Sequence, residues 1–230
     1  MPFMEQDARY HEFADTRSLW GMANATDTIT NVAFLTVGVM GLAFLWREGR
    51  AATPRHFIVR EEMRAYLILF LAVTLTAFGS AFYHLAPDNG RLVWDRLPMS
   101  LAFAALDAAT VAERIRLSAG LRLLAPLTML GAGSVAWWRL TGDLLPYAVA
   151  QFGSIGAILV IVMRFRSRYT HAGTMYAVLV CYALAKIAEA CDARVYALGH
   201  IVSGHSLKHL LAAAAAWLVL DMLRKRHVDR

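Results

Sequence analysis

Long apolar runs alternate with short polar segments along this chain. Three of the runs, 28–46, 65–87 and 144–163, contain no Lys, Arg, Asp or Glu. Each run is 19 to 23 residues long. A helix of about 20 apolar residues crosses the ~30 Å hydrocarbon core of a membrane. Each run therefore predicts one membrane-spanning helix.

Four further apolar runs are shorter or contain a charged residue, and they also predict helices. They are 97–112, 123–138, 169–191 and 203–223. We therefore expect an all-α, polytopic membrane protein with a bundle of seven transmembrane helices. Its parts are a polar N-terminal segment (1–25), the seven-helix domain (26–223) and a basic tail (224–230).

The basic residues favour one orientation of this bundle. Arg and Lys concentrate in the segments 47–64, 114–122 and 164–168 and in the tail. Loops rich in Arg and Lys face the cytoplasm, which predicts a cytoplasmic C-terminus and an outside or lumenal N-terminus. Arg outnumbers Lys 20 to 3. This bias favours a bacterial source and the inner membrane.

Composition excludes most soluble classes. Hydrophobic residues make up 58% of the chain and charged residues 17%, and the mean hydropathy is +0.46. A soluble domain has roughly a quarter charged residues, so disorder, a coiled coil and most cytosolic enzyme folds are excluded. The net charge of +6 follows from the basic membrane-facing loops, and we expect no nucleic-acid partner.

Ionisable side chains meet at the predicted outer ends of three helices. Ser80 and His84 are four residues apart near the end of one helix, and His205 and His209 have the same spacing at the start of another. Residues four apart share a helix face. Asp95 lies near the start of the intervening helix, so all five side chains can converge at one level of the bundle.

Three histidines in this arrangement predict a catalytic zinc site. Such sites use three protein ligands and keep the fourth position for water. Zinc lowers the pKa of that water to about 7. Asp95 can then accept its proton and Ser80 can donate to the developing oxyanion. The alternative is that the histidines only hydrogen-bond within a polar bundle interior.

The same residues resemble a known family. The blocks Ser80-x-x-Phe-Tyr-His84, Asp95-Arg-Leu-Pro-Met99 and His205-x-x-x-His209 are similar to the three signature blocks of the alkaline ceramidases. These enzymes belong to the seven-helix superfamily that includes the adiponectin and progestin receptors. The resemblance extends from about Glu12 to Leu211.

The resemblance implies a function and a role for each motif residue. His84, His205 and His209 would bind zinc, Asp95 would act in proton transfer, and Ser80 would assist at the amide oxygen. The family cleaves the amide of ceramide by attack of zinc-bound water, which gives a sphingoid base and a fatty acid. The expected partners are a ceramide-like lipid amide and membrane lipids, with the site toward the outer side.

The N-terminal segment resembles the family less closely. Glu12-Phe-Ala-Asp15 is similar to an acidic element that supplies calcium ligands in the family, and Asn24 falls where a second Glu is usual. Glu12, Asp15 and Asn24 are thus implied as a calcium set. Arg17 stands where the family has an oxygen ligand. The alternative is that the positive charge of its guanidinium replaces that of a calcium ion.

Two other functions stay open on the sequence. One is a receptor or lipid-binding protein of the same superfamily, with structural zinc and little or no turnover. The other is a small transporter that uses Asp107, Lys186 and Glu189 as a proton path. The structural alternative to a proton path is that Lys186 contacts Asp107 and the pair stabilises the bundle. Lys208, between the paired histidines, is expected to point outward to the membrane surface.

Overall fold

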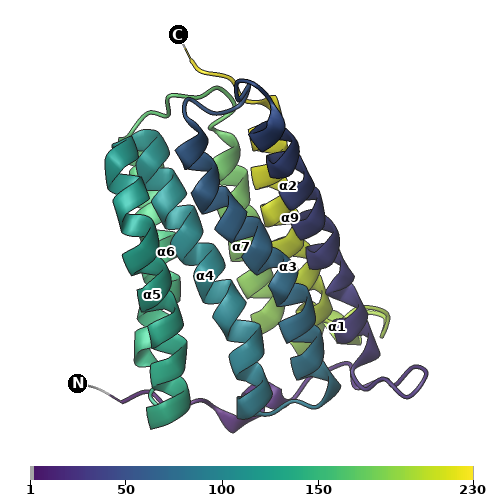
Figure 1. The fold of residues 1–230 in the computed structure, drawn as a ribbon. Helices are drawn as coiled ribbons and strands as arrows, with labels where there is room; N and C mark the ends of the chain where they lie inside the picture. Colours follow the sequence, from purple (N-terminus) through teal and green to yellow (C-terminus); the bar gives the residue numbers. More distant parts are fainter. Residues whose placement is uncertain (1–2, 230) are drawn as a thin grey trace.

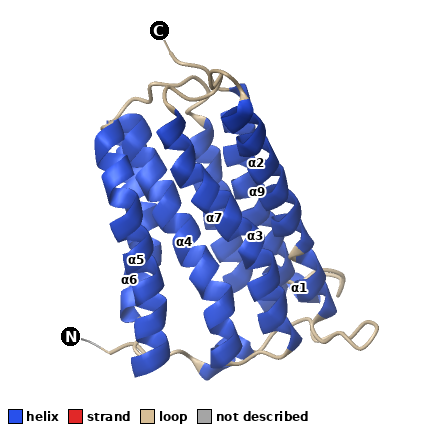
Figure 2. Ribbon diagram, in the orientation of Figure 1, coloured by secondary structure: helices blue, strands red, loops and turns tan. Residues whose placement is uncertain are grey.

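Helices make up most of the chain, and the computed structural model, which describes residues 3–229, contains no strand in that range (Figure 2). The elements are η1 (Ala8–His11), α1 (Ala25–Thr30), α2 (Val32–Arg50), η2 (Arg60–Glu62), α3 (Met63–Leu85), α4 (Asn89–Arg114), α5 (Leu117–Thr141), α6 (Leu145–Arg164), α7 (Thr174–Ala190), α8 (Asp192–Ala197) and α9 (Gly204–Lys225). The predicted all-α class is confirmed.

The long helices lie side by side, and the two ends of the chain lie at opposite ends of this bundle (Figure 1). Within the described residues, five helical segments are long and apolar enough to cross a membrane. They are Ala25–Arg50, Arg60–Leu85, Leu117–Thr141, Leu145–Arg164 and Gly204–Lys225. These segments indicate a membrane-embedded protein.

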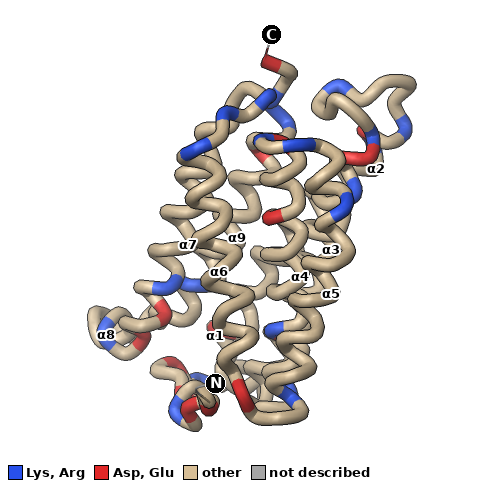
Figure 3. The backbone as a smooth tube through the Cα atoms, turned by 90° about the vertical axis from the view of Figure 1, so that its left-hand side faces the viewer, with Lys and Arg blue, Asp and Glu red and all other residues tan. Residues whose placement is uncertain are grey.

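The outer surface of α3 supports a lipid environment. Leu67, Leu71, Leu75 and Phe78 are 46–60% exposed and follow one another at helical spacing. Soluble proteins rarely expose large contiguous apolar patches, whereas lipid chains cover such a stripe. The charged residues concentrate toward the two ends of the bundle (Figure 3).

α4 and α7 do not belong to the set of five, α4 because it contains several charged residues and α7 because it is too short. α4 begins at Asn89, so that Asp95 and Arg96 lie inside the helix and not in a loop before it. α7 has 17 residues and includes Lys186 and Glu189. These four side chains line a cavity described below.

A close approach of α3 to α4 determines where the two helices place their polar residues. A methyl group added at Gly79 would collide with the carbonyl oxygen of Trp94. This oxygen receives no bond from the residue one turn later, because Pro98 has no backbone N–H. Glycine at position 79 therefore lets α3 approach α4 at Trp94, and Ser80 and Asp95, the next residues in sequence, lie beside each other.

The opposite end of the bundle contains a buried arginine. Arg226, just beyond α9, is 2% exposed. Its Nη1 donates to a carboxylate oxygen of Glu113 at 3.0 Å and to the hydroxyl oxygen of Tyr66 at 3.3 Å. The residue belongs to the predicted basic tail, yet its side chain packs inside the bundle.

Candidate metal centre

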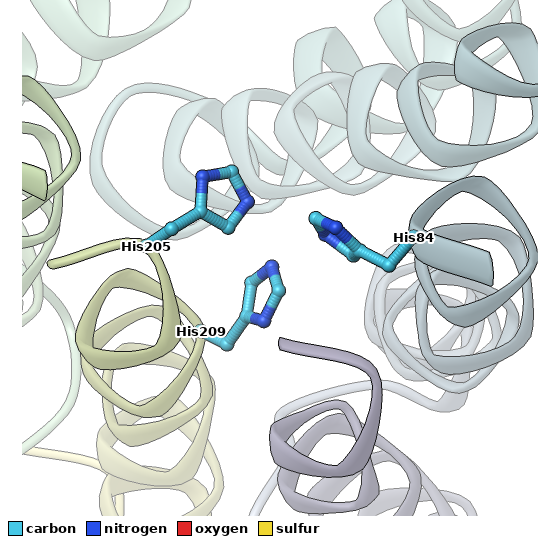
Figure 4. Close-up of side chains that lie close together, drawn as sticks. All are labelled: His84, His205 and His209. Carbon is cyan, nitrogen blue, oxygen red and sulfur yellow. The ribbon is translucent and has the colours of Figure 1, made fainter. Parts of the chain in front are cut away.

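Three histidine side chains meet at the end of the bundle that the N-terminal segment covers. His84 lies on the last turn of α3, and His205 and His209 lie on the first turns of α9. One candidate ligand atom from each lies within 4.8 Å of the other two. The ring centroids are 4.8–5.0 Å apart, and the rings face one another (Figure 4). The predicted convergence of these histidines is therefore present.

His84 provides the test of whether a metal ion fits. It is fully buried, and neither of its ring nitrogens has a hydrogen-bond partner among the described residues. Leaving a buried polar group unpaired costs about 1–3 kcal/mol. A neutral imidazole beside two others is a donor set that suits zinc. The residues present therefore fit a metal ion, and zinc is compatible with them.

Thr30 orients His209. Its hydroxyl donates to the carbonyl oxygen of Asp27 at 3.1 Å and lies 2.9 Å from Nδ1 of His209. Because the hydroxyl proton points to Asp27, Nδ1 of His209 is the donor in the second contact. The lone pair of His209 is then on Nε2, the nitrogen that faces the other two rings (Figure 4). This role of Thr30 was not predicted from the sequence.

His205 is held through its backbone and contacted by a lysine at its ring. Its backbone N–H donates to Oδ1 of Asp192 at 2.7 Å, and Nε2 lies 2.9 Å from Nζ of Lys208. Lys208 also pairs with Glu189 at 3.0 Å. The expectation that Lys208 points outward is wrong: the side chain turns into the bundle and lines its cavity.

Asp192 connects three segments at this end of the bundle. Oδ1 accepts the hydrogen bond from the backbone N–H of His205 on the first turn of α9, and Oδ2 accepts one from the backbone N–H of Ala14 at 2.9 Å. A methyl group added at Gly204 would collide with Ala188 at the end of α7. The N-terminal segment, α7–α8 and α9 are thus fixed together around His205.

A cavity of about 290 Å³ adjoins the histidines and extends between the helices. His209, Ser80 and Asp95 line it together, and Ser80 and Asp95 are buried. Most of its other lining residues are apolar side chains of α4, α6, α7 and α9. The structure therefore brings both predicted catalytic residues to a space that can take an apolar chain.

The charged residues of α7 pair with each other and with α9. Glu189 forms ion pairs with Lys186 and Lys208. Lys186 forms no ion pair with Asp107, so the suggested stabilising contact between these two residues is wrong. Asp107 instead lies beside Ser154 of α6.

The predicted calcium residues have other partners or none. Both carboxylate oxygens of Asp15 accept bonds from the Arg17 guanidinium, at 2.8 and 2.6 Å. The hydrogen bonds from Arg17 lower the pKa of the Asp15 carboxyl. The side chain of Asn24 donates to the carbonyl oxygen of His84 at 2.8 Å, while Glu12 is exposed. A calcium ion at Asp15 would have to displace Arg17, and the calcium set stays a prediction.

Phe13, which the sequence did not single out, covers the metal centre. Its ring centroid lies 4.7 Å from those of both His84 and His205, and it is 9% exposed. The segment before α1 therefore excludes water from one side of the histidines. No periodic signal identifies Phe13, because the segment that carries it is irregular.

No protein-family model and no curated protein matches this chain.

Proposed function

We propose that this protein is a zinc-dependent hydrolase of lipid amides, embedded in a membrane by seven helices. The observation that carries the proposal is the buried His84, which has no hydrogen-bond partner at either ring nitrogen among the described residues and lies beside His205 and His209, next to a largely apolar cavity. The resemblance of the three motif blocks to alkaline ceramidases supports a ceramide-like lipid as substrate.

The proposed membrane arrangement assigns one span to each long helix. α4 and α7 would cross with their charged side chains turned to the cavity, where they are protected from lipid. The distribution of Arg supports a cytoplasmic C-terminus and places the histidines toward the outer side of a bacterial inner membrane. An acyl chain would then lie in the apolar part of the cavity, with its amide at the histidines.

His84, His205 and His209 would hold zinc, which when bound acidifies a water molecule and polarises a carbonyl group. The buried carboxylate of Asp95 would take a proton from the attacking water and pass it to the leaving nitrogen. Ser80, beside Asp95, would donate to the carbonyl oxygen as it becomes negative. One C–O bond forms and the C–N bond breaks, which releases a fatty acid and an amine.

The number of ligands supports an enzyme over a receptor with structural zinc. Structural zinc sites are closed by four protein ligands, whereas catalytic sites keep one position open. The described residues provide three histidines and no fourth His, Cys, Asp or Glu in the same group. The transporter alternative gains no support, because Lys186 and Glu189 pair with each other and neither forms an ion pair or hydrogen bond with Asp107 among the described residues.

The experiment that tests the proposal measures zinc content and turnover on the same protein. We expect about one zinc per chain in detergent-purified protein, markedly less in His209→Ala, and release of fatty acid from a panel of lipid amides. Asp95→Asn should keep zinc and lose turnover. Well-folded wild-type protein that holds no zinc after supplementation would contradict the proposal.

A further inference from the structure

A second buried arginine lines the cavity, and it forms no ion pair with a carboxylate among the described residues. Arg96, next to Asp95 on α4, is 4% exposed. Its Nη2 donates to the side-chain oxygen of Gln6, and its Nη1 has no hydrogen-bond partner within residues 3–229. A buried charge needs a partner and hydrogen bonds to offset the loss of water. Arg96 therefore has an unused donor in a side chain that lines the cavity.

Aromatic rings hold this guanidinium in place. Its central carbon lies 4.3 Å from the ring centroid of Trp138, 4.9 Å from that of Tyr147 and 5.3 Å from that of Tyr10. Three rings around a guanidinium stabilise its charge through cation–π attraction. They also fix its plane, but they give no negative charge and no acceptor to Nη1.

Comparison with Arg226 shows what Arg96 lacks. Both arginines are almost completely buried and both lie against aromatic rings. Arg226 has the carboxylate of Glu113 at 3.0 Å. Arg96 has the neutral side chains of Gln6 and Tyr10 beside it, and forms no ion pair with any described carboxylate. Arg226 is therefore paired with a carboxylate, whereas Arg96 is not.

The charges around the cavity lead to the same conclusion. Its charged lining residues are Asp95, Glu189, Arg96, Lys186 and Lys208. Glu189 pairs with both lysines, so these three groups satisfy one another. Two carboxylates face three cations, so the cavity lining carries one positive charge in excess. Asp95, the proposed proton acceptor, is the adjacent residue in sequence.

We propose that Arg96 binds an anionic group on the headgroup side of the amide, so that the substrate is an anionic lipid amide and not a neutral one. This inference rests on the proposed function and specifies its substrate. The anionic group is a carboxylate, sulfonate or phosphate a few bonds from the amide nitrogen, because Arg96 adjoins Asp95. Arg96 acts in binding and is not a catalytic residue.

The test compares lipid amides that share one acyl chain. N-palmitoylglycine, N-palmitoyltaurine and the phosphate ester of N-palmitoylethanolamine carry the three anions, and N-palmitoylethanolamine is the neutral match. Dissociation constants are measured on zinc-free His209→Ala protein in neutral detergent, where no turnover intervenes. We expect the anionic amides to bind at least about tenfold more tightly, which is about 1.4 kcal/mol. The anion that binds best identifies the headgroup.

Variants on the same background assign the preference to Arg96. Arg96→Gln should reduce the ratio to about one, and Arg96→Lys should keep part of it. Arg91→Gln is the matched control, since Arg91 lies one turn earlier on α4 and outside the cavity lining. An equal affinity of the parent protein for neutral and anionic amides would overturn the inference even if Arg96→Gln does not fold.

Two further outcomes separate this inference from the proposed function. If neutral amides are hydrolysed by zinc-loaded protein as fast as anionic ones, the inference fails and the hydrolase stands. If no amide is hydrolysed but the Arg96-dependent preference is present, the hydrolase fails and an anionic lipid ligand stands. If Arg96→Gln loses affinity only for free palmitate, then Arg96 binds the carboxylate of the product, and the inference is overturned.

Discussion

Thr30 and His209 form a contact that determines which nitrogen of the histidine is free. The hydroxyl oxygen of Thr30 lies 2.9 Å from Nδ1 of His209, and its proton points to the carbonyl oxygen of Asp27. The histidine must then carry its proton on Nδ1. Groups that orient a metal-binding histidine in this way commonly change metal affinity 10–100-fold when removed.

Replacing Thr30 should therefore weaken zinc binding. We expect Thr30→Val to lower the affinity about 10–100-fold, because the methyl group that replaces the hydroxyl cannot accept from Nδ1. Thr30→Ser should keep the affinity. Competition with a chromogenic chelator measures it. Thr36→Val is the control, since Thr36 bonds only to the carbonyl oxygen of Val32 on its own helix. Equal affinities in Thr30→Val and wild type would remove Thr30 from the centre.

Lys208 should oppose zinc. Its ammonium lies 2.9 Å from Nε2 of His205, so that it competes with an ion for the lone pair and repels it. We expect Lys208→Met to bind zinc about tenfold more tightly in the same chelator competition. Glu189 keeps Lys186 as a partner. Lys225→Met, on the last turn of α9, should change nothing, and weaker binding in Lys208→Met would show that the lysine supports the site.

Gly79→Ala should destabilise the protein and impair turnover together. Its methyl group would collide with the carbonyl oxygen of Trp94, which forces α3 away from α4 and separates Ser80 from Asp95. Overpacking of this kind costs about 1–3 kcal/mol. Thermal unfolding in detergent measures the loss. Gly133→Ala is the control, because a methyl group at Gly133 meets nothing within 4 Å, and it should be neutral or stabilising.

The Asp15–Arg17 pair should make stability depend on pH in the acidic range. The hydrogen bonds from Arg17 lower the pKa of Asp15 in the folded state. The pair therefore stabilises the protein fully above the unfolded pKa of about 3.9, and this contribution is lost as the pH falls toward the lower folded value. Melting temperatures of wild type and Asp15→Asn should differ at pH 6 and converge below about pH 4. A constant difference would contradict this prediction.

The sequence predicts most of the helices because lipid imposes a simple rule on them. Charge-free runs of membrane length identify α2, α3 and α6 directly. α4 begins at Asn89, eight residues before the predicted apolar run 97–112, because hydropathy does not extend that run through Asp95 and Arg96. Their charged side chains line the cavity, and a hydropathy profile does not distinguish a charged residue that faces an interior cavity from one in a loop.

The metal centre was predictable in part for a related reason. The i, i+4 spacing places His205 and His209 on one face whatever the tertiary structure, and the order of the helices brings His84 to the same level. The contributions of Thr30, Phe13 and the inward turn of Lys208 depend on how distant segments pack. Side-chain direction across two packed helices has no signature in either segment alone.

The position of the ligands along the chain also determines when the centre can exist. His84 is followed by about 120 residues before His205 is made, and its partners lie on α9, the last helix of the described chain. At synthesis rates of 5–20 residues per second, roughly 6–24 s separate the two events. A nascent chain thus holds only one of the three metal ligands until its final helix has joined the bundle. Metal loading then reports on complete assembly, and chains arrested before Gly204 cannot compete for zinc through this centre.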